Sequence, residues 1–283
     1  HGTTTLEAKT GYGLDIETEL RQLEVILKLD EEGPLELIPT YLGAHAIPPE
    51  FAGNAEGYTD FLCSEALPAV QAWWQEHAPA RTLPFVDVFC EEGAFDLAQT
   101  RRILLRAQEL GFPLKLHADE FANLGGASLA AELGATSADH LVKTLAEDIH
   151  KLAESNTVAV SLPGTPFGLA QSEYTPARKI IAAGGLLALA TDLNPGTSWN
   201  ESMQFIQALA CRTLKLTPAE ALAASTINAA AALGLAEKLG SLTPGKQADL
   251  IILKVPDYRM LSYRYGTNLV STVIKKGVVY PLS

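Results

Sequence analysis

Short apolar runs rich in β-branched residues alternate along the chain with longer segments whose apolar positions recur at helical spacing. The first longer segment carries Ile16, Leu20 and Leu23 after Asp15, a suitable helix N-cap. The alternation predicts parallel strands joined by crossover helices, as in a doubly wound sheet or a (β/α)8 barrel. The short runs predict seven strands, at residues 3–9, 35–42, 85–89, 114–118, 137–141, 158–162 and 186–190.

Polar residues at the strand ends distinguish these two folds. A dinucleotide-binding doubly wound sheet needs a GxGxxG turn after its first strand, and residues 9–15 lack that spacing. In a barrel, by contrast, the carboxyl ends of all strands converge on one mouth, where such enzymes place their chemistry. Polar side chains do occur at or just after most of the predicted strand ends, namely Tyr12, His45, Glu91, His117, His140 and Asp192. The sequence therefore favours the barrel.

The pattern changes after Gly240, where a turn-forming stretch precedes the apolar run 250–253. A further pair of β-rich segments, 272–276 and 278–280, flanks Gly277 and predicts a hairpin. We therefore expect two units, residues 1–239 as the barrel domain and residues 240–283 as part of a small β-layer.

Composition narrows the class of protein. The chain has 283 residues, is 47% hydrophobic and carries a formal net charge of −12, as expected of a globular protein without a basic surface for nucleic acid or an anionic membrane. Its longest nearly apolar run, 180–190, contains two glycines and is shorter than the roughly 20 residues that span a bilayer. Cys63, Cys90 and Cys211 lie far apart and form no disulfide or CxxC pattern, so a reducing cytoplasm fits best.

Two histidines and an aspartate at neighbouring strand ends are candidates for metal chemistry. His117 and His140 end successive strands, and Asp192 follows the apolar strand 186–190. Imidazole and carboxylate suit a divalent ion such as zinc or iron, which lowers the pKa of water toward about 7. Catalytic sites of this kind have three or more protein ligands, so these residues alone leave the site incomplete.

Several longer stretches occur in a fixed order from the first residue onward. They are HGTTTLEAKTGYGL (1–14), LGAHAIPP (42–49), VDVFCE (86–91), KLHADE (115–120), ADH (138–140), ATDLNPGT (190–197) and GKQAD (245–249). Together they resemble imidazolonepropionases, which are metal-dependent amidohydrolases of histidine degradation.

This resemblance implies a (β/α)8 barrel with a small β-sandwich built from both chain ends. In the family a His-x-His pair on the first barrel strand supplies two metal ligands, and His117 and Asp192 match the other two. The chain has no counterpart of that pair, nor of an arginine that follows it and contacts substrate. We therefore expect barrel strands two to eight and the C-terminal part of the sandwich, with the amino-terminal part of the family pattern missing. Because the segment 85–91 lacks a lysine at its end, one divalent ion, zinc or iron, is favoured over two.

The resemblance also implies a reaction. The family hydrolyses the cyclic amide bond of 4-imidazolone-5-propanoate, a small molecule, to N-formimidoyl-L-glutamate. By this resemblance Asp192 takes the proton of the attacking water, and His140 stabilises the carbonyl oxygen as charge develops on it. Glu120 would hold the ring nitrogen or carry a proton to it.

A further set of residues matches the family's substrate contacts, namely Tyr12, His45, Glu120, Asn194, Gly196 and Thr197. Ser198 and Glu201 have capping-box spacing, which predicts a helix that begins directly after this loop. The free backbone N–H groups of its first turn would offer a site for an anion or a carbonyl.

The parity of charged residues along the strands predicts a charged layer inside the barrel. Glu7 and Lys9 are two positions apart, as are Lys115 and His117, so each pair shares one strand face. If these faces point inward, Lys115 is expected to be buried and to pair with Asp87 or Glu7.

Two alternatives stay open from the sequence. The His-x-x-Glu spacing of His117 and Glu120 also occurs in metal-dependent deaminases of guanine or cytosine, although the Tyr12 and His45 motifs disfavour them. The chain could instead be a catalytically incomplete, metal-free fragment or a binding protein on the same scaffold. A homodimer is also left open.

Overall fold

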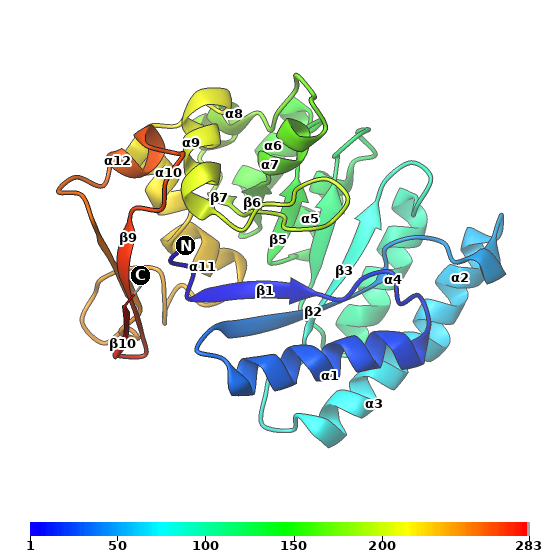
Figure 1. Ribbon diagram of the computed structural model, residues 1–283. Coiled ribbons are helices and arrows are strands. Elements are labelled where there is room, and N and C mark those ends of the chain that lie inside the picture. The colour runs from blue at the N-terminus through cyan, green and yellow to red at the C-terminus, as the bar shows by residue number, and fades with distance from the viewer. Residues whose placement is uncertain (282–283) are drawn as a thin grey trace.

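A seven-stranded parallel sheet forms the centre of the computed structural model, which describes residues 1–281. Its strand order is β1-β2-β3-β4-β5-β6-β7, and every neighbouring pair is parallel (Figure 1). The strands are β1 (Thr5–Lys9), β2 (Glu36–Ala44), β3 (Phe85–Cys90), β4 (Lys115–Ala118), β5 (Ser137–His140), β6 (Val158–Ser161) and β7 (Leu187–Leu189). All seven strands predicted from the sequence are confirmed.

Helices connect successive strands and cover the outside of the sheet. They are α1 (Ile16–Glu32), η1 (Pro49–Phe51), α2 (Ala55–Phe61), η2 (Leu62–Ala66), α3 (Leu67–His77), α4 (Leu97–Glu109), α5 (Gly126–Leu133), α6 (Ala146–Ala153), α7 (Gly164–Gly168), α8 (Ala177–Ala182), α9 (Met203–Thr213), α10 (Pro218–Ala224), α11 (Ile227–Ala232) and α12 (Met260–Tyr263). Within residues 1–281, no helix is both long and apolar enough to cross a membrane.

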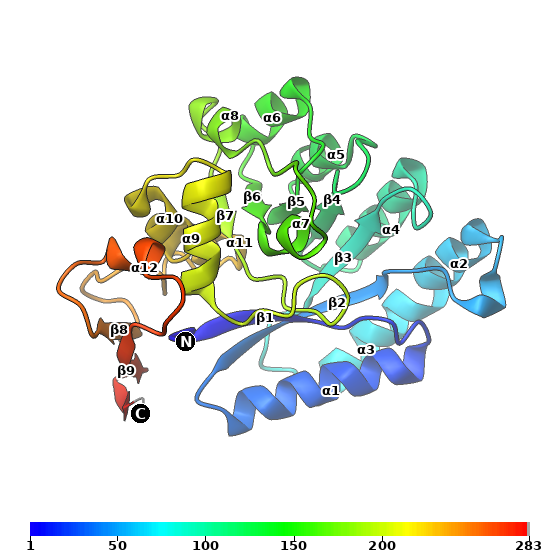
Figure 2. The same cartoon turned by 45° about the horizontal axis from the view of Figure 1, so that its top comes forward.

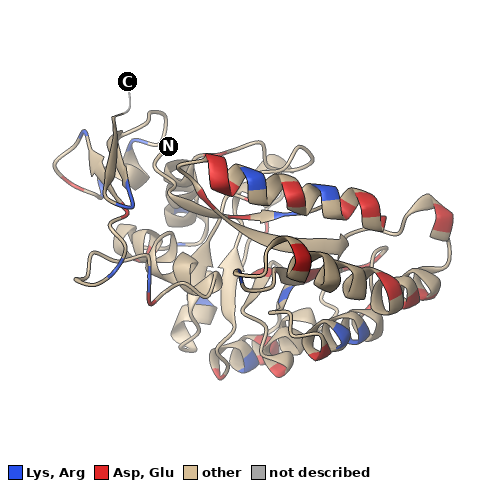
Figure 3. Cartoon of the chain, turned by 90° about the horizontal axis from the view of Figure 1, so that it is seen from below, with Lys and Arg blue, Asp and Glu red and all other residues tan. Residues whose placement is uncertain are grey.

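Helix α1 shows how local sequence sets these boundaries. It begins after Asp15, as predicted, because Asp15 Oδ1 accepts the backbone N–H of Thr18 at 2.8 Å. Its apolar stripe, which includes Leu23 and Leu27, packs into the core, while acidic and basic positions intermix on the outside (Figure 3). The helix therefore covers the sheet with one face and leaves its charged face to solvent.

The sheet curls around a shared interior. Lys9 lies on β1 and Asp139 on β5, yet Lys9 Nζ is 3.3 Å from Asp139 Oδ2. In a flat sheet, strands four places apart would be separated by about 19 Å, which is farther than a lysine side chain reaches. The described strands thus form a half-barrel whose two edges are β1 and β7. This arrangement confirms the predicted α/β barrel class, with seven parallel strands among the described residues.

A separate three-stranded antiparallel sheet lies beside the start of β1 (Figure 2). Its strands, in the order β10-β9-β8, are β8 (Leu250–Leu253), β9 (Val270–Lys275) and β10 (Val278–Pro281). The predicted hairpin is confirmed, since Lys276 and Gly277 have φ of 51° and 80° and join β9 to β10. The last two residues of the predicted unit 240–283 lie outside the described part of the chain.

One buried lysine fastens this small sheet to the half-barrel. Lys275, at the end of β9, donates hydrogen bonds to Asp249 Oδ2 at 2.6 Å, Glu36 Oε2 at 2.9 Å and Thr5 Oγ1 at 3.1 Å. Glu36 begins β2 and also accepts hydrogen bonds from Lys238 and Gln247. The cluster therefore links the start of the chain, the start of β2 and the small sheet.

The Glu36 cluster predicts that the folded protein loses stability as the pH falls into the acid range. Burial alone would raise the pKa of Glu36, but hydrogen bonds from Lys275, Gln247 and Lys238 outweigh it and hold the pKa at about 2. A carboxylate whose pKa is lowered on folding stabilises the protein above its unfolded pKa, and that contribution disappears as pH falls through its folded pKa. We expect Glu36→Gln to lower the free energy of unfolding by about 2–3 kcal/mol at pH 7.

The difference between Glu36→Gln and the unsubstituted chain should shrink as pH falls from about 4.5 toward 2, and urea unfolding at several pH values measures it. Glu31→Gln is a matched control, because Glu31 is an exposed residue of α1. A difference for Glu36→Gln that is equally large at pH 7 and pH 3 would contradict the electrostatic explanation.

Candidate active site

Three imidazole rings meet at the carboxyl ends of β2, β4 and β5. His45 follows β2, His117 lies near the end of β4, and His140 is the last residue of β5. The ring centroids of His117 and His140 are 5.2 Å apart, and those of His45 and His117 are 6.5 Å apart. The structure thus gathers these three sequence-predicted site residues at one mouth of the half-barrel.

Asp192 follows β7, at the same end of the sheet as these residues. Its charge contributes to the pKa values of Glu120, His45 and His140, which places it in their neighbourhood. Thr165, from α7, donates a hydrogen bond from Oγ1 to Asp192 Oδ2 and orients that carboxylate. No sequence pattern indicates Thr165, because its partner comes from a different βα unit.

Strained backbone marks this mouth. Tyr12, Asp119, His140 and Asp192 have φ of 56°, 55°, 75° and 50°, in the left-handed region that residues with a side chain seldom adopt. Each lies at or just after the carboxyl end of a strand. These turns aim side chains that a relaxed strand-to-helix connection would direct elsewhere.

Glu120 and His140 form a buried acid–base pair. His140 Nε2 lies 3.5 Å from Glu120 Oε2, and both side chains are nearly inaccessible to solvent. Burial raises the pKa of Glu120 to about 7, and burial together with nearby His117 lowers the pKa of His140 to about 4. Near neutral pH the imidazole of His140 is therefore uncharged, and the carboxyl of Glu120 can both give and accept a proton.

Tyr12 and His45 form the outer part of the mouth. Their ring centroids are 4.1 Å apart, and Tyr12 is 71% exposed. His45 is half-buried, and burial lowers its pKa to about 4. The pair therefore combines an accessible phenol with a neutral imidazole, two groups that can donate hydrogen bonds to a ligand.

The loop after β7 differs from the sequence-based expectation. Residues 194–202 do not begin a helix at Ser198, because α9 starts at Met203 with Ser202 as its N-cap. Ser198 Oγ instead donates to the carbonyl oxygen of Thr191 at 2.9 Å. The predicted helix start is therefore wrong.

The backbone donors expected to bind an anion in this loop are also occupied. Asn194 Oδ1 accepts the N–H of Gly196 at 2.9 Å and that of Thr197 at 2.8 Å, which closes an Asx turn. The structure places Asn194, Gly196 and Thr197 together, but their N–H groups are already paired. Asn194 Nδ2, which donates to Asp192 O at 2.8 Å, ties the loop to the aspartate.

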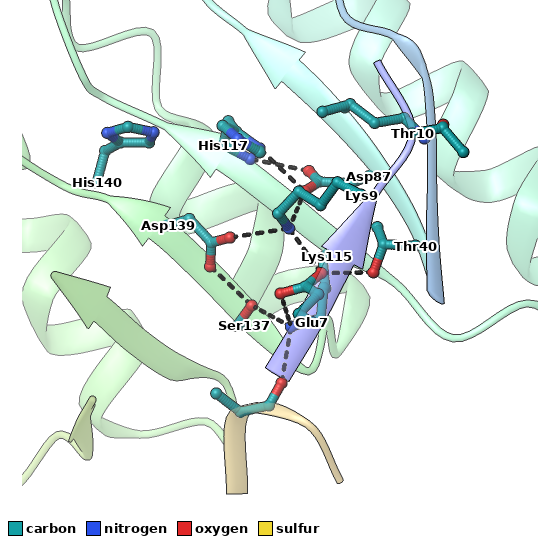
Figure 4. Close-up of polar contacts among 12 residues, drawn as sticks. Glu7, Lys9, Thr10, Thr40, Asp87, Lys115, His117, Ser137, Asp139 and His140 are labelled. Carbon is teal, nitrogen blue, oxygen red and sulfur yellow. Dashed lines mark hydrogen bonds and ion pairs between the residues drawn. The ribbon is translucent and has the colours of Figure 1, made fainter. Parts of the chain in front are cut away.

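A layer of charged side chains fills the interior below the histidines (Figure 4). Lys9 Nζ lies 2.7 Å from Glu7 Oε1, 2.7 Å from Asp87 Oδ2 and 3.3 Å from Asp139 Oδ2. Lys115 is buried and lies 3.3 Å from Glu7 Oε2. The predicted pairing of Lys115 with Glu7 is confirmed, whereas the carboxylate of Asp87 pairs with Lys9.

Asp87 also contacts His117. Its Oδ2 lies 2.9 Å from the ring Nδ1, and its Oδ1 accepts the backbone N–H of His117 at 3.1 Å. Burial alone would lower the pKa of His117, but Asp87 outweighs it and raises the pKa to about 9. His117 is therefore held by a carboxylate on the side of the ring that faces the charged layer.

The donor set fits a divalent cation. His117 and Asp192 offer the nitrogen and oxygen donors that zinc and iron accept. The Nδ1 atoms of His45, His117 and His140 are buried without a well-directed hydrogen bond among residues 1–281, although His117 Nδ1 lies 2.9 Å from Asp87 Oδ2. Buried polar atoms of this kind are uncommon, and a bound ligand or ion is one explanation for them.

A second combination, Asp87, His117 and Asp139, offers three ligand atoms within 4.8 Å of one another. Lys9 Nζ lies against both carboxylates, so an ammonium group already neutralises them.

Glu91, at the end of β3, holds the loop that carries Glu120. Its Oε2 accepts the N–H of Phe121 at 2.9 Å, and its Oε1 accepts the N–H of Ala122 at 3.1 Å. The sequence placed Glu91 at the mouth but did not indicate this function, because the partners are backbone groups of another loop.

The fold and site together are those of a known family. A model of the amidohydrolase family matches residues 98–280, so the chain belongs to the amidohydrolase family. Among curated relatives, the imidazolonepropionase of Herpetosiphon aurantiacus is 56% identical over 279 residues, 99% of this chain and 65% of that protein. The imidazolonepropionase of Parabacteroides distasonis is 50% identical over 99% of this chain and 65% of its own length. The resemblance read from the sequence is confirmed, and the chain spans slightly less than two thirds of these relatives.

Solved structures support the same fold. A zinc-bound adenosine deaminase from Xanthomonas campestris has a TM-score of 0.69 at 21% identity and covers 98% of this chain and 66% of its own. An atrazine chlorohydrolase from Arthrobacter aurescens, complexed with zinc, has a TM-score of 0.74 at 13% identity. The match covers 98% of this chain and 68% of the chlorohydrolase chain. At these identities the likeness establishes architecture alone.

The contacts of Glu91 predict that it controls the order of the Glu120 loop. In Glu91→Gln an amide NH2 group replaces one accepting oxygen and faces a backbone N–H. We expect a loss of about 1–3 kcal/mol in the free energy of unfolding and faster hydrogen exchange at Phe121 and Ala122. Glu92→Gln, at the exposed neighbouring position, should change neither. Unchanged exchange at both amides in Glu91→Gln would show that the loop is held by other contacts.

Proposed function

We propose that this chain provides most of the active site of an imidazolonepropionase, which hydrolyses the cyclic amide of 4-imidazolone-5-propanoate to N-formimidoyl-L-glutamate. The observation that carries the proposal is the convergence of His117, His140, Glu120 and Asp192 on one mouth. The 50–56% identity to imidazolonepropionases over nearly the whole chain supports this substrate rather than another amide.

His117 and Asp192 would hold one divalent ion, zinc or iron. Such an ion polarises the substrate carbonyl and makes the attacking water more acidic. One ion is favoured because β3 ends in Phe89 and Cys90 and is followed by Glu91, without a lysine to bridge two ions. The zinc reported for two structures of the same architecture is consistent with a divalent ion at this site.

Asp192 and His140 have complementary tasks in the proposed reaction. Asp192, oriented by Thr165, accepts the proton of water as it attacks the carbonyl carbon. His140 is neutral near pH 7, so its N–H can donate a hydrogen bond to the carbonyl oxygen while negative charge develops there.

Glu120 is suited to proton transfer toward the leaving ring nitrogen. Its pKa of about 7 keeps both protonation states populated near neutral pH. It lies beside His140, on the loop held by Glu91. We assign it the role of holding this nitrogen and delivering a proton to it.

The outer residues would bind the substrate's ring and propionate. Tyr12 and His45 offer a hydroxyl and an imidazole N–H at the entrance. Asn194, Gly196 and Thr197 form the opposite loop. Its backbone carbonyls remain as contact points, because the Asx turn uses the N–H groups of Gly196 and Thr197 and the Asn194 side chain bonds the Thr197 hydroxyl.

We also propose a division of the chain into two domains, on the basis of the same family resemblance. Residues 1–239 would form the amidohydrolase barrel domain, and residues 240–283 would belong to a β-sandwich. The substrate is a small molecule, the cytoplasm is the proposed location, and a homodimer is the assembly to test for by analytical ultracentrifugation.

The proposed reaction is tested with Asp192→Asn. An amide cannot accept the water proton, so we expect turnover to fall at least about 100-fold. The assay follows the loss of imidazolone absorbance in the 283-residue chain and in the same chain extended to the length of its relatives. Asp257→Asn, at a partly exposed aspartate in the connection between β8 and α12, should leave turnover unchanged. Full activity in Asp192→Asn would refute its assigned role, and ammonia release from guanine or cytosine would favour a deaminase.

A further inference from the structure

The charged layer below the mouth has a direct connection to His117. The Oδ2 atom of Asp87 lies 2.9 Å from His117 Nδ1 and accepts a hydrogen bond from Lys9 Nζ at 2.7 Å. Asp87 Oδ1 accepts the backbone N–H of His117 at 3.1 Å. In Figure 4 the His117 ring lies between Asp87 and His140. One carboxylate therefore contacts both the main chain and the side chain of the histidine.

Lys9 is itself fixed in place. Its ammonium group is held by Glu7 and Asp139 as well as by Asp87, so contacts from three strands converge on it. Ser137 donates to Asp139 Oδ1 at 2.8 Å and so orients that carboxylate too. Lys9 has no freedom to leave Asp87 without breaking two other ion pairs.

The charges of the layer do not cancel. Glu7, Asp87 and Asp139 are acidic, and Lys9 and Lys115 are basic, which leaves a formal charge of −1 beneath His117. A negative layer favours a positive charge on the imidazole, whether from a proton or from a cation bound at its far nitrogen. A carboxylate can only accept, so the ring nitrogen that faces Asp87 must carry the hydrogen.

We propose that Lys9 is a positioning residue that acts through Asp87: it keeps the Asp87 carboxylate 2.9 Å from His117 Nδ1, so that Nδ1 carries the ring hydrogen and Nε2 is left as the free donor atom at the mouth. Partners of this kind raise the basicity of a ligating histidine and fix its orientation. The link from this positioning to metal affinity rests on the proposed function, whereas the ring geometry does not.

The ring geometry is tested by NMR of the chain labelled with ¹⁵N-histidine. A protected, downfield proton bonded to Nδ1 of His117 is expected in the unsubstituted chain, and His117→Gln assigns it. In Asp87→Asn and Lys9→Met we expect this signal to move upfield and its exchange with water to accelerate by about tenfold or more. An unchanged signal in both variants would overturn the proposal.

Two further variants separate positioning from general destabilisation. Lys9→Met alone leaves the Asp139 carboxylate without its ammonium partner and could prevent folding. The double variant Lys9→Met with Asp139→Asn removes that carboxylate as well, and it keeps the formal charge of the layer at −1. It should still weaken the ring-proton signal, and a signal like that of the unsubstituted chain would overturn the proposal. Lys275→Met is the matched control, because Lys275 is a buried lysine with two carboxylate partners in the small sheet, and it should leave the signal unchanged.

Zinc affinity, measured by competition with a chromophoric chelator, gives the second readout. We expect Asp87→Asn and Lys9→Met to weaken zinc binding by about 10–100-fold and Lys275→Met to leave it unaltered. Unchanged zinc affinity in both layer variants would overturn the positioning role. If His117→Gln binds zinc as the unsubstituted chain does, the proposed metal role of His117 fails, and the ring-proton measurement still decides the positioning separately.

Discussion

The fold depends on pairing charged side chains inside a curled parallel sheet. An ammonium or carboxylate group moved from water into such an interior costs several kcal/mol unless it is paired and hydrogen-bonded. Lys9 is paired with Glu7 and Asp87, and it also reaches Asp139 on β5 because the sheet curls. Lys115 is held by Glu7, by Ser137 Oγ and by the carbonyl oxygen of Ala232 at 2.7 Å. The curvature of the sheet brings the charged side chains into contact, and their pairing in turn stabilises the curved sheet. The apolar packing between sheet and helices stabilises the fold as well.

The elements of the fold could be predicted because each leaves a local pattern. Buried parallel strands carry short apolar runs, and the two-residue spacing of Lys115 and His117 places both on one strand face. The partners of Lys9 leave no such pattern, since Asp139 is 130 positions away and four strands across. Their pairing follows from the curvature of the sheet, which no single segment encodes.

Parts of the site were hidden for a different reason. Ser198 and Glu201 carry the spacing of a helix start, but a hydroxyl that caps a helix can equally bond a nearby carbonyl, here that of Thr191. Glu91 and Thr165 act on groups in neighbouring loops, so their roles follow from the closeness of strand ends rather than from sequence spacing. The sequence shows which residue types occur at these positions, but it does not show which groups they bond.

The contact between Lys275 and Thr5 joins residues that are 270 positions apart. An interaction of that sequence separation cannot guide early folding, because the entropy of closing so long a loop must be met before the contact forms. The βα units of the half-barrel pair strands that are neighbours along the chain, and they can assemble first. We therefore expect the small sheet to attach to β1 late in folding, when residues near the two ends of the chain meet beside a half-barrel that has already formed.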